Sequence, residues 1–375
     1  MRRSFSIPAA LYLGNAKSTM SKLASTFSKE NQVNKSKVCL VLAAAAAITM
    51  TSVSWAASKQ QPLELTKSIS LPMLHDGDFD HFTADVESSR LFSAAEENSK
   101  VLVFNLKTGE LMQTLSDLKA PHSLLYRDDL HRLFVVDGDL GVVRMYDGST
   151  YKPVGDIELR KGADSAAYDP ATKYLYVVDG GKDADLPNSF LAVVDTTSDK
   201  KIAESKLNSD DVEAVVLSKT SPRMFVNIRG KNAVEVFDRK TLQLLATWPM
   251  PPNVTKPTAM AFDEPAHRLF IGTRTPARLV VLDSDTGKVL SDEPAASMVD
   301  DMSYDTTHKR IYFAGTDKLD VFQEGGNGKY ELIGAVPTGF RAKTGTFVPQ
   351  LNRYYLGVPH HNERPAELRI YSVEP

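Results

Sequence analysis

Seven residues recur at a nearly constant spacing, and most of them carry side chains that can bind ions or move protons. Successive members are 42, 42, 49, 45, 42 and 43 residues apart. These ring residues are Asp80, His122, Asp164, Glu213, Thr258, Asp300 and Lys343. Converging carboxylates suit a hard cation such as Ca²⁺, whereas an imidazole with one or two carboxylates suits Zn²⁺ or another transition metal. The candidate metal ligands are therefore His122, Glu213 and Asp300, with Ca or Zn as the candidate ion.

The same residue types also allow interpretations without a metal. The acids can be solvated, or paired with Lys343, Arg229 and Arg274, as exposed charges often are. Alternatively, His122 can act as a general base while Arg274 or Arg229 stabilises a developing oxyanion and Glu213 orients water or a metal. The catalytic candidates are accordingly His122, Glu213 and Arg274.

A second repeat follows each ring residue by ten positions. It consists of Arg or Tyr followed by two apolar or aromatic residues, and its seven copies begin at Arg90, Arg132, Tyr174, Arg223, Arg268, Arg310 and Arg353. Runs rich in β-branched and aromatic residues surround each copy and predict short strands. A period of this length fits four antiparallel strands and their turns, which is one blade of a β-propeller. We interpret the repeated arginines as part of the scaffold.

The last repeat indicates how the ring of blades closes. It holds three expected strands, around 343–349, 353–358 and 367–373, and residues 63–71 provide the best candidate for the missing outer strand. Joining both ends of the domain in one blade avoids unpaired strand edges. We therefore predict one all-β domain over 58–375, a seven-bladed propeller with four antiparallel strands per blade.

In a propeller, the loops that precede the inner strands share a face with the loops between the second and third strands. The ring residues are expected there, at one mouth of the central channel, which is a favoured place for a ligand. A one-residue shift of an inner strand would bring His81 or Asp301 forward in place of its neighbour. The candidate ligand-binding residues are Asp80, His81, His122, Asp164, Glu213, Arg229, Arg274, Asp300, Asp301, Lys343 and His360. Glu96, Asp137 and Asp179 lie in the same second set of loops.

Two segments carry a resemblance to a known family. Tyr176-Val177-Val178-Asp179 and Phe134-Val135-Val136-Asp137 resemble the signature of YVTN-repeat or YncE-like β-propellers, an aromatic residue and Val followed by a polar turn and a Val-rich strand. The resemblance covers 62–375. It implies an exported seven-bladed propeller, and it implies little about activity because members of the family share no single one.

Residues 1–57 have the features of a targeting segment. Lys35 and Lys37 precede the apolar run 38–48, and Ser54-Trp55-Ala56 places small residues at the positions that a signal peptidase reads. We expect a secretory signal peptide at the end of an N-terminal extension, cleaved near Ala56 or Ala57, and a periplasmic or secreted product. Either Met1 or Met20 can be the start of translation.

Composition narrows the functional classes. Residues 58–375 hold 37 Lys and Arg against 46 Asp and Glu, a net charge of −9, which disfavours a broad nucleic-acid surface. The single cysteine, Cys39, lies in the leader, so the mature protein would have no thiol nucleophile and no disulfide. No segment after the leader has the length and apolarity of a membrane span.

Two functions remain open at this point. The first is a monomeric binding or scaffold protein that recognises a small molecule, a metal or an envelope protein, since the body lacks recognisable nucleophile, nucleotide and metalloprotease motifs. The second is a hydrolase of lactonase type, with or without a metal. Ala120-Pro121-His122 faintly resembles the Pro-Arg-His element of some seven-bladed lactonases, although the arginine is missing.

Overall fold

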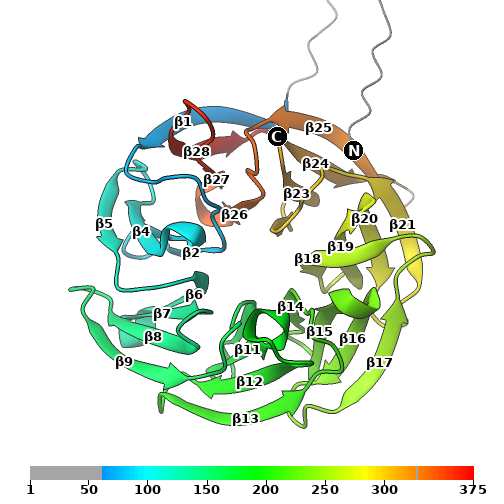
Figure 1. The fold of residues 1–375 in the computed structure, drawn as a ribbon. Helices are drawn as coiled ribbons and strands as arrows, with labels where there is room; N and C mark the ends of the chain where they lie inside the picture. The colour runs from blue at the N-terminus through cyan, green and yellow to red at the C-terminus, as the bar shows by residue number, and fades with distance from the viewer. Residues whose placement is uncertain (1–60, 327) are drawn as a thin grey trace, which may run out of the picture. The chain divides into compact units, whose positions relative to one another are not determined.

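The computed structural model describes residues 61–326 and 328–375, which belong to one compact unit, Lys59–Pro375. Within these residues, 28 strands form seven four-stranded antiparallel sheets. The sheets are arranged as blades in a ring (Figure 1). The predicted fold class is confirmed, whereas the predicted signal peptide lies outside the described residues.

Six blades are built from four consecutive strands each. Blade 1 contains β2 (Phe82–Asp85), β3 (Arg90–Ala95), β4 (Lys100–Asn105) and β5 (Leu111–Leu115). Blade 2 contains β6 (Pro121–Arg127), β7 (Arg132–Asp137), β8 (Val142–Asp147) and β9 (Pro153–Glu158). Blade 3 contains β10 (Ala166–Asp169), β11 (Tyr174–Gly180), β12 (Ser189–Asp195) and β13 (Lys200–Lys206). Blade 4 contains β14 (Val215–Leu217), β15 (Arg223–Ile228), β16 (Ala233–Asp238) and β17 (Leu244–Pro249). Blade 5 contains β18 (Thr255–Asp263), β19 (Arg268–Thr275), β20 (Ala277–Asp283) and β21 (Val289–Pro294). Blade 6 contains β22 (Met302–Asp305), β23 (Arg310–Gly315), β24 (Lys318–Glu324) and β25 (Tyr330–Pro337). Five short 3₁₀ turns follow inner or second strands: η1 (Glu96–Asn98), η2 (Asp128–Leu130), η3 (Gly181–Ala184), η4 (Arg229–Lys231) and η5 (Pro349–Leu351).

The seventh blade joins the two ends of the domain. Its sheet has the order β1-β28-β27-β26, with β26 (Thr344–Val348), β27 (Arg353–Val358), β28 (Ala366–Val373) and β1 (Leu63–Leu71). Leu63 pairs with Val373 and Leu71 with Ala366, so the blue strand β1 lies beside the red strand β28 in Figure 1. The predicted closure is confirmed.

The core lies between neighbouring blades. All six residues of β3 are buried, because blades pack against both faces of the second strand, whereas most of the outer strand β13 is exposed. Phe92 of blade 1 packs with Tyr126 and Leu133 of blade 2 in one such interface. Burial of both faces explains why the middle strands are nearly continuous apolar runs.

The repeated arginines link adjacent blades. Arg90 Nη2 lies 2.6 Å from a carboxylate oxygen of the buried Asp85, and its guanidinium also donates to the Gly148 carbonyl and the Tyr151 hydroxyl of blade 2. Arg310 likewise donates to the Glu374 carbonyl at the end of the chain. These contacts support a scaffold role. Across the described ranges, no helix has the length and apolarity needed to cross a membrane.

Candidate ligand site at the channel mouth

The ring residues occupy equivalent places in the seven blades: five stand one or two residues before the inner strand, and His122 and Thr258 lie within β6 and β18. Three of them show this directly, because they donate backbone N–H groups to the second strand of their own blade at 2.9, 3.0 and 2.9 Å: Asp80 to Ala94, Asp164 to Val178 and Glu213 to Asn227. All seven ring residues line one polar cavity of about 610 Å³. The equal spacing in the sequence therefore becomes a common position around one space.

Three further candidates line the same cavity. His81 follows a ring residue, Arg229 opens η4, and Arg274 lies near the end of β19. Other polar residues of the lining were not among our candidate ligand residues: Glu96, Glu97, Ser99, Lys119, Asp139, Lys182 and Asp183. Some of these lie in long loops, such as the Gly180–Asn188 insertion, and loop length was the sequence signal that could have indicated them.

Asp301 belongs to an adjoining cavity of about 240 Å³. This second space shares His81 and Asp300 with the first, and its lining includes the apolar side chains of Leu124 and Met302. Ring residues and their neighbours thus both face the channel, in two adjoining cavities. His81 and Asp301 therefore reach these cavities together with their neighbours Asp80 and Asp300, without the one-residue shift of an inner strand that would exchange them.

Some residues of the second loop set lie elsewhere. His360 is hydrogen-bonded to Asp76 and lines neither cavity. Asp137 is buried and accepts backbone N–H groups from Lys119 and Ala120 at 2.7 and 3.2 Å. Buried Asp179 accepts the backbone N–H of Arg160 at 2.9 Å. These two aspartates hold the loops in place, because buried backbone donors need partners.

Five Lys and Arg side chains line the cavity, and four of them have carboxylate partners, whereas Lys119 forms no ion pair among the described residues. The pairs are Lys182 with Asp211, Arg229 with Asp211 and Glu213, Arg274 with Asp300, and Lys343 with Asp300 and Asp78. Nη2 of Arg274 and Nζ of Lys343 each lie 2.5 Å from an oxygen of Asp300. In blades 4 to 7, the arrangement agrees with the interpretation in which acids are paired with basic side chains.

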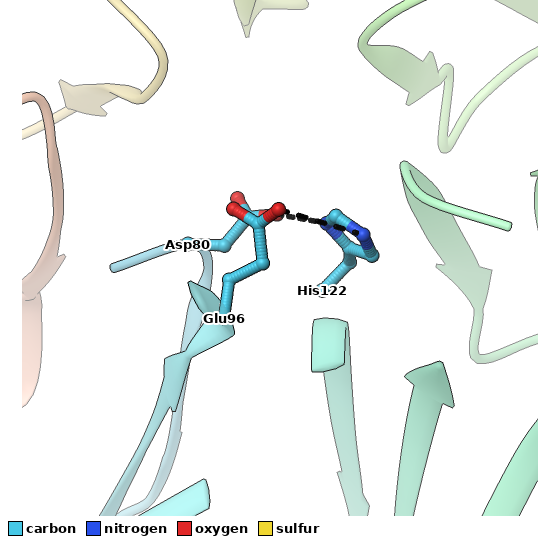
Figure 2. A group of neighbouring side chains, drawn as sticks. All are labelled: Asp80, Glu96 and His122. Carbon is cyan, nitrogen blue, oxygen red and sulfur yellow. Dashed lines mark hydrogen bonds and ion pairs between the residues drawn. The ribbon is translucent and has the colours of Figure 1, made fainter. Parts of the chain in front are cut away.

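The acids of blades 1 to 3 gather instead around His122. Figure 2 shows the carboxylates of Asp80 and Glu96 close together and directed toward this ring. Nδ1 of His122 lies 2.6 Å from Asp80 Oδ2 and 3.5 Å from Asp164 Oδ1, while Nε2 lies 4.0 Å from Glu96 Oε1. Gly138 makes room for the ring, because a Cβ there would meet His122 Nε2 at 3.0 Å and the Ala163 carbonyl at 2.9 Å.

Burial raises the pKa values of several carboxyl groups in the two cavities. Burial and the charges of Asp80 and Asp164 raise the pKa of Glu96 to about 7, although the charge of His122 opposes them. Burial and the charge of Asp164 raise the pKa of Glu213 to about 8, against the effect of Arg229. Burial likewise raises the pKa values of Asp164 and Asp301.

The pKa values of His81 and His122 are raised, whereas burial alone lowers the pKa of an imidazole. Burial lowers the pKa of His122, but the charge of Asp164 and the hydrogen bond to Asp80 outweigh it and raise the pKa to about 10. Burial also lowers the pKa of His81, but Asp80 and Asp301 raise it well above the usual value. Burial raises the pKa of Asp80, and the two histidines more than reverse this effect. Both shifts favour the protonated form of the imidazole ring.

Two sets of side chains bring potential metal-binding atoms within 4.8 Å of one another in the described residues: Asp80, Glu96 and His122, and Asp80, His81 and Asp164. The sequence instead suggested His122, Glu213 and Asp300. The structure does not gather those three as one set, because Glu213 pairs with Arg229 and Asp300 with Arg274 and Lys343. The ligand-binding and catalytic roles of the candidate residues remain predictions.

Comparisons with known proteins support the architecture. No family model and no curated protein sequence matches the chain. Among solved structures, hydrazine synthase of Kuenenia stuttgartiensis is similar with a TM-score of 0.65 and 14% identity, over 74% of this chain and 92% of that one. The WD40 repeats of RRP9 match with a TM-score of 0.68 and 11% identity, over 84% and 99% of the two chains.

A third similar structure comes from the mitotic checkpoint complex, with a TM-score of 0.67 and 13% identity over 95% of this chain and 100% of that one. These TM-scores establish a shared fold, whereas identities this low carry no information about activity. The specific YVTN-repeat resemblance therefore stays a prediction. What these comparisons and the sheet topology establish is that residues 61–326 and 328–375 form a seven-bladed β-propeller.

Proposed function

We propose that this protein is an exported binding protein that takes a small, positively charged ligand at one mouth of its central channel. The observation that carries the proposal is that most basic side chains of the cavity are paired with carboxylates, while two of its carboxylates have no basic Lys or Arg partner. Arg229 and Lys182 pair with Asp211, and Arg274 and Lys343 pair with Asp300. Within the described part of the chain, the carboxylates of Glu96 and Asp164 accept no hydrogen bond, and each forms a single ion pair, with His122 at 4.0 and 3.5 Å.

Unpaired carboxylates in a partly enclosed cavity favour a cation for a simple physical reason. Their mutual repulsion is weakly screened away from bulk water, so a positive ligand relieves it more than a neutral one does. An anion would have to displace existing partners of the arginines, which costs free energy. The cavity volume of about 610 Å³ is large enough for a hydrated ion or a small organic cation.

Calorimetry and thermal unfolding of the untagged protein test this proposal. The panel would contain Zn²⁺, Ca²⁺, putrescine and choline, with phosphate, citrate and acetate as anions of similar size. At least one cation should bind, and at a concentration about 100 times its dissociation constant it should stabilise the fold by about 2.7 kcal/mol. Asp164→Asn should weaken that binding, while the exposed Asp285→Asn should not. Equal binding of the anions, or no cation binding, would contradict the proposal.

The export part of the proposal rests on residues 1–57 and on the resemblance to YVTN-repeat propellers, whose members are exported. Expression of the full chain in a Gram-negative host, followed by fractionation and intact-mass measurement, tests it. We expect a periplasmic product that begins near Ala57 or Ser58. A cytoplasmic product of full length would rule out the leader as a signal peptide in that host.

A lactonase-like hydrolase is the second candidate, and the close His122–Asp80 pair is the observation in its favour. A carboxylate 2.6 Å from Nδ1 can orient an imidazole for proton transfer. The raised pKa of His122, about 10, weighs against it, because a protonated ring cannot accept a proton. Assays on a lactone panel would support this function if turnover occurs and disappears in His122→Ala.

A further inference from the structure

The orientation of His81 is the first of three observations about the cavity. Its Nδ1 lies 2.9 Å from an oxygen of Asp301, whose own side chain is mostly buried. Its other ring nitrogen, Nε2, is directed toward Asp80 and lies 3.5 Å from Oδ1. Metal-binding histidines commonly show this arrangement, in which a carboxylate fixes one ring nitrogen and the other faces the ion.

The second observation is that His81 has two acids near it that can share an ion. Ligand atoms from Asp80, His81 and Asp164 all lie within 4.8 Å of one another. The Asp164 carboxylate accepts no hydrogen bond from any residue of the described ranges, so its oxygens are available to a ligand. The three residues come from blades 1 and 3 and line the same cavity.

The third observation concerns the kind of ion. One imidazole nitrogen and two carboxylate oxygens, with an open side toward a cavity, match a zinc site with three protein ligands and one exchangeable position. Calcium prefers six to eight oxygen ligands, and this set supplies a nitrogen and few oxygens. Imidazole with carboxylates suits zinc and related divalent transition metals.

The overlapping set of Asp80, Glu96 and His122 is less suitable (Figure 2). Both ring nitrogens of His122 face carboxylates of that same set, with Nδ1 next to Asp80 and Nε2 next to Glu96. The carboxylate of Asp164, outside that set, lies 3.5 Å from Nδ1 without a hydrogen bond, whereas Asp301 is hydrogen-bonded to His81 at 2.9 Å. His122 therefore has the arrangement of a counter-ion to the acids.

We propose that the positively charged ligand is a divalent transition metal ion bound by Asp80, His81 and Asp164, with Asp301 as a positioning residue for His81. This inference rests on the proposed function, since it names the ligand of the same cavity. The ion keeps one coordination position open toward the cavity of about 610 Å³, where water or a small donor molecule completes its shell.

Metal analysis of the untagged full-length protein tests the assignment. After dialysis against Zn²⁺ and then against metal-free buffer, we expect about one zinc per chain. Protein loaded with Co²⁺ instead should show the visible absorption of a four- or five-coordinate site. His81→Ala and Asp164→Asn should abolish both signals. Asp164 makes no hydrogen bond through its side chain, so the asparagine variant should stay folded, as thermal unfolding would verify.

Two further variants separate positioning from binding. Asp301→Asn should lower the zinc affinity by about 10- to 100-fold and change the Co²⁺ spectrum, as expected for the loss of a carboxylate behind a ligating histidine. Asp285→Asn and Glu331→Gln, two exposed carboxylates that line neither cavity, serve as controls that should retain about one zinc per chain. An unchanged affinity and spectrum in Asp301→Asn would overturn the positioning role.

The outcomes distinguish this inference from the proposed function. If putrescine or choline binds in an Asp164-dependent way and no divalent transition metal does, the metal assignment is wrong and the cation-binding function stands. If neither kind of cation binds, both are wrong. If zinc binds, but is lost in His122→Ala and kept in His81→Ala, the ion lies in the other set and our assignment of ligands is overturned.

Discussion

Nδ1 of His81 lies 2.9 Å from a carboxylate oxygen of Asp301, a residue 220 positions later in the chain. The first stands before β2 of blade 1 and the second before β22 of blade 6, with blade 7 following blade 6 in the ring. Blade 7 contains both ends of the domain. The contact therefore exists because the ring is closed, and strand β1 is the first place to test the architecture.

Two leucines of β1 form a matched pair for this test. Leu71 is 1% exposed and Leu65 is 48% exposed. We expect Leu71→Ala to lower the free energy of unfolding by about 2–5 kcal/mol, because it leaves a cavity between blades 7 and 1. Leu65→Ala should change it by no more than about 0.5 kcal/mol. Urea denaturation of both variants checks the prediction, which equal effects would contradict.

The link between Arg90 and Asp85 should contribute strongly to folding. Asp85→Asn removes the charge that faces a mostly buried guanidinium at 2.6 Å, so we expect a loss of about 3–5 kcal/mol in unfolding free energy. Asp285→Asn breaks a comparable but exposed pair with Arg223 and should cost less than about 1 kcal/mol. A small effect in Asp85→Asn, measured by urea denaturation, would mean that the other contacts of Arg90 hold the blades together.

Gly138 should be required for the position of His122. A Cβ at residue 138 would lie 2.9 Å from the backbone oxygen of Ala163 and 3.0 Å from His122 Nε2, so either the loop or the ring must move. We expect Gly138→Ala to cost about 1–3 kcal/mol in stability and to shift the His122 ring resonances in NMR spectra. Gly326→Ala meets nothing within 4 Å and serves as the control. Unchanged His122 resonances in Gly138→Ala would contradict the prediction.

The raised pKa of Glu213 predicts a pH dependence of stability. Burial raises this pKa from 4.5 to about 8, so between these values the folded protein holds a proton that the unfolded chain has released. Because the native state binds more protons, its stability must fall as pH rises through this window, by at most about 1.4 kcal/mol per pH unit from this group.

Glu213→Gln removes that contribution. The difference in unfolding free energy between the variant and the wild type should grow in favour of the variant from about pH 5 to pH 8, as measured by urea denaturation at several pH values. Glu331→Gln, on the exposed part of β25, should give a curve parallel to the wild type. A parallel curve for Glu213→Gln would show that this carboxyl is ionised in the fold.

The repeat made much of the fold and the location of the site predictable. Each blade follows the same backbone path, so counting ten positions back from Arg90 and its counterparts selects equivalent places, which is why the ring residues line one cavity. His360 was selected from the second set of loops and not by this count, and it is hydrogen-bonded to Asp76 and lines neither cavity. The insertion at Gly180–Asn188 brought Lys182 and Asp183 to the cavity, which a count from the repeat cannot reveal.

By itself, the sequence determined the blade period, the strand shared between the two ends and the shared cavity of the seven ring residues, because these depend on local pattern and repetition. Tertiary structure alone decided how the charges pair. Glu213 and Asp300 are satisfied by Arg229 and Arg274, whereas Asp164 is left facing the cavity. The physical reason is that Coulomb energy and hydrogen bonding depend on distances of a few ångströms between different blades, and such distances exist only once the ring has closed.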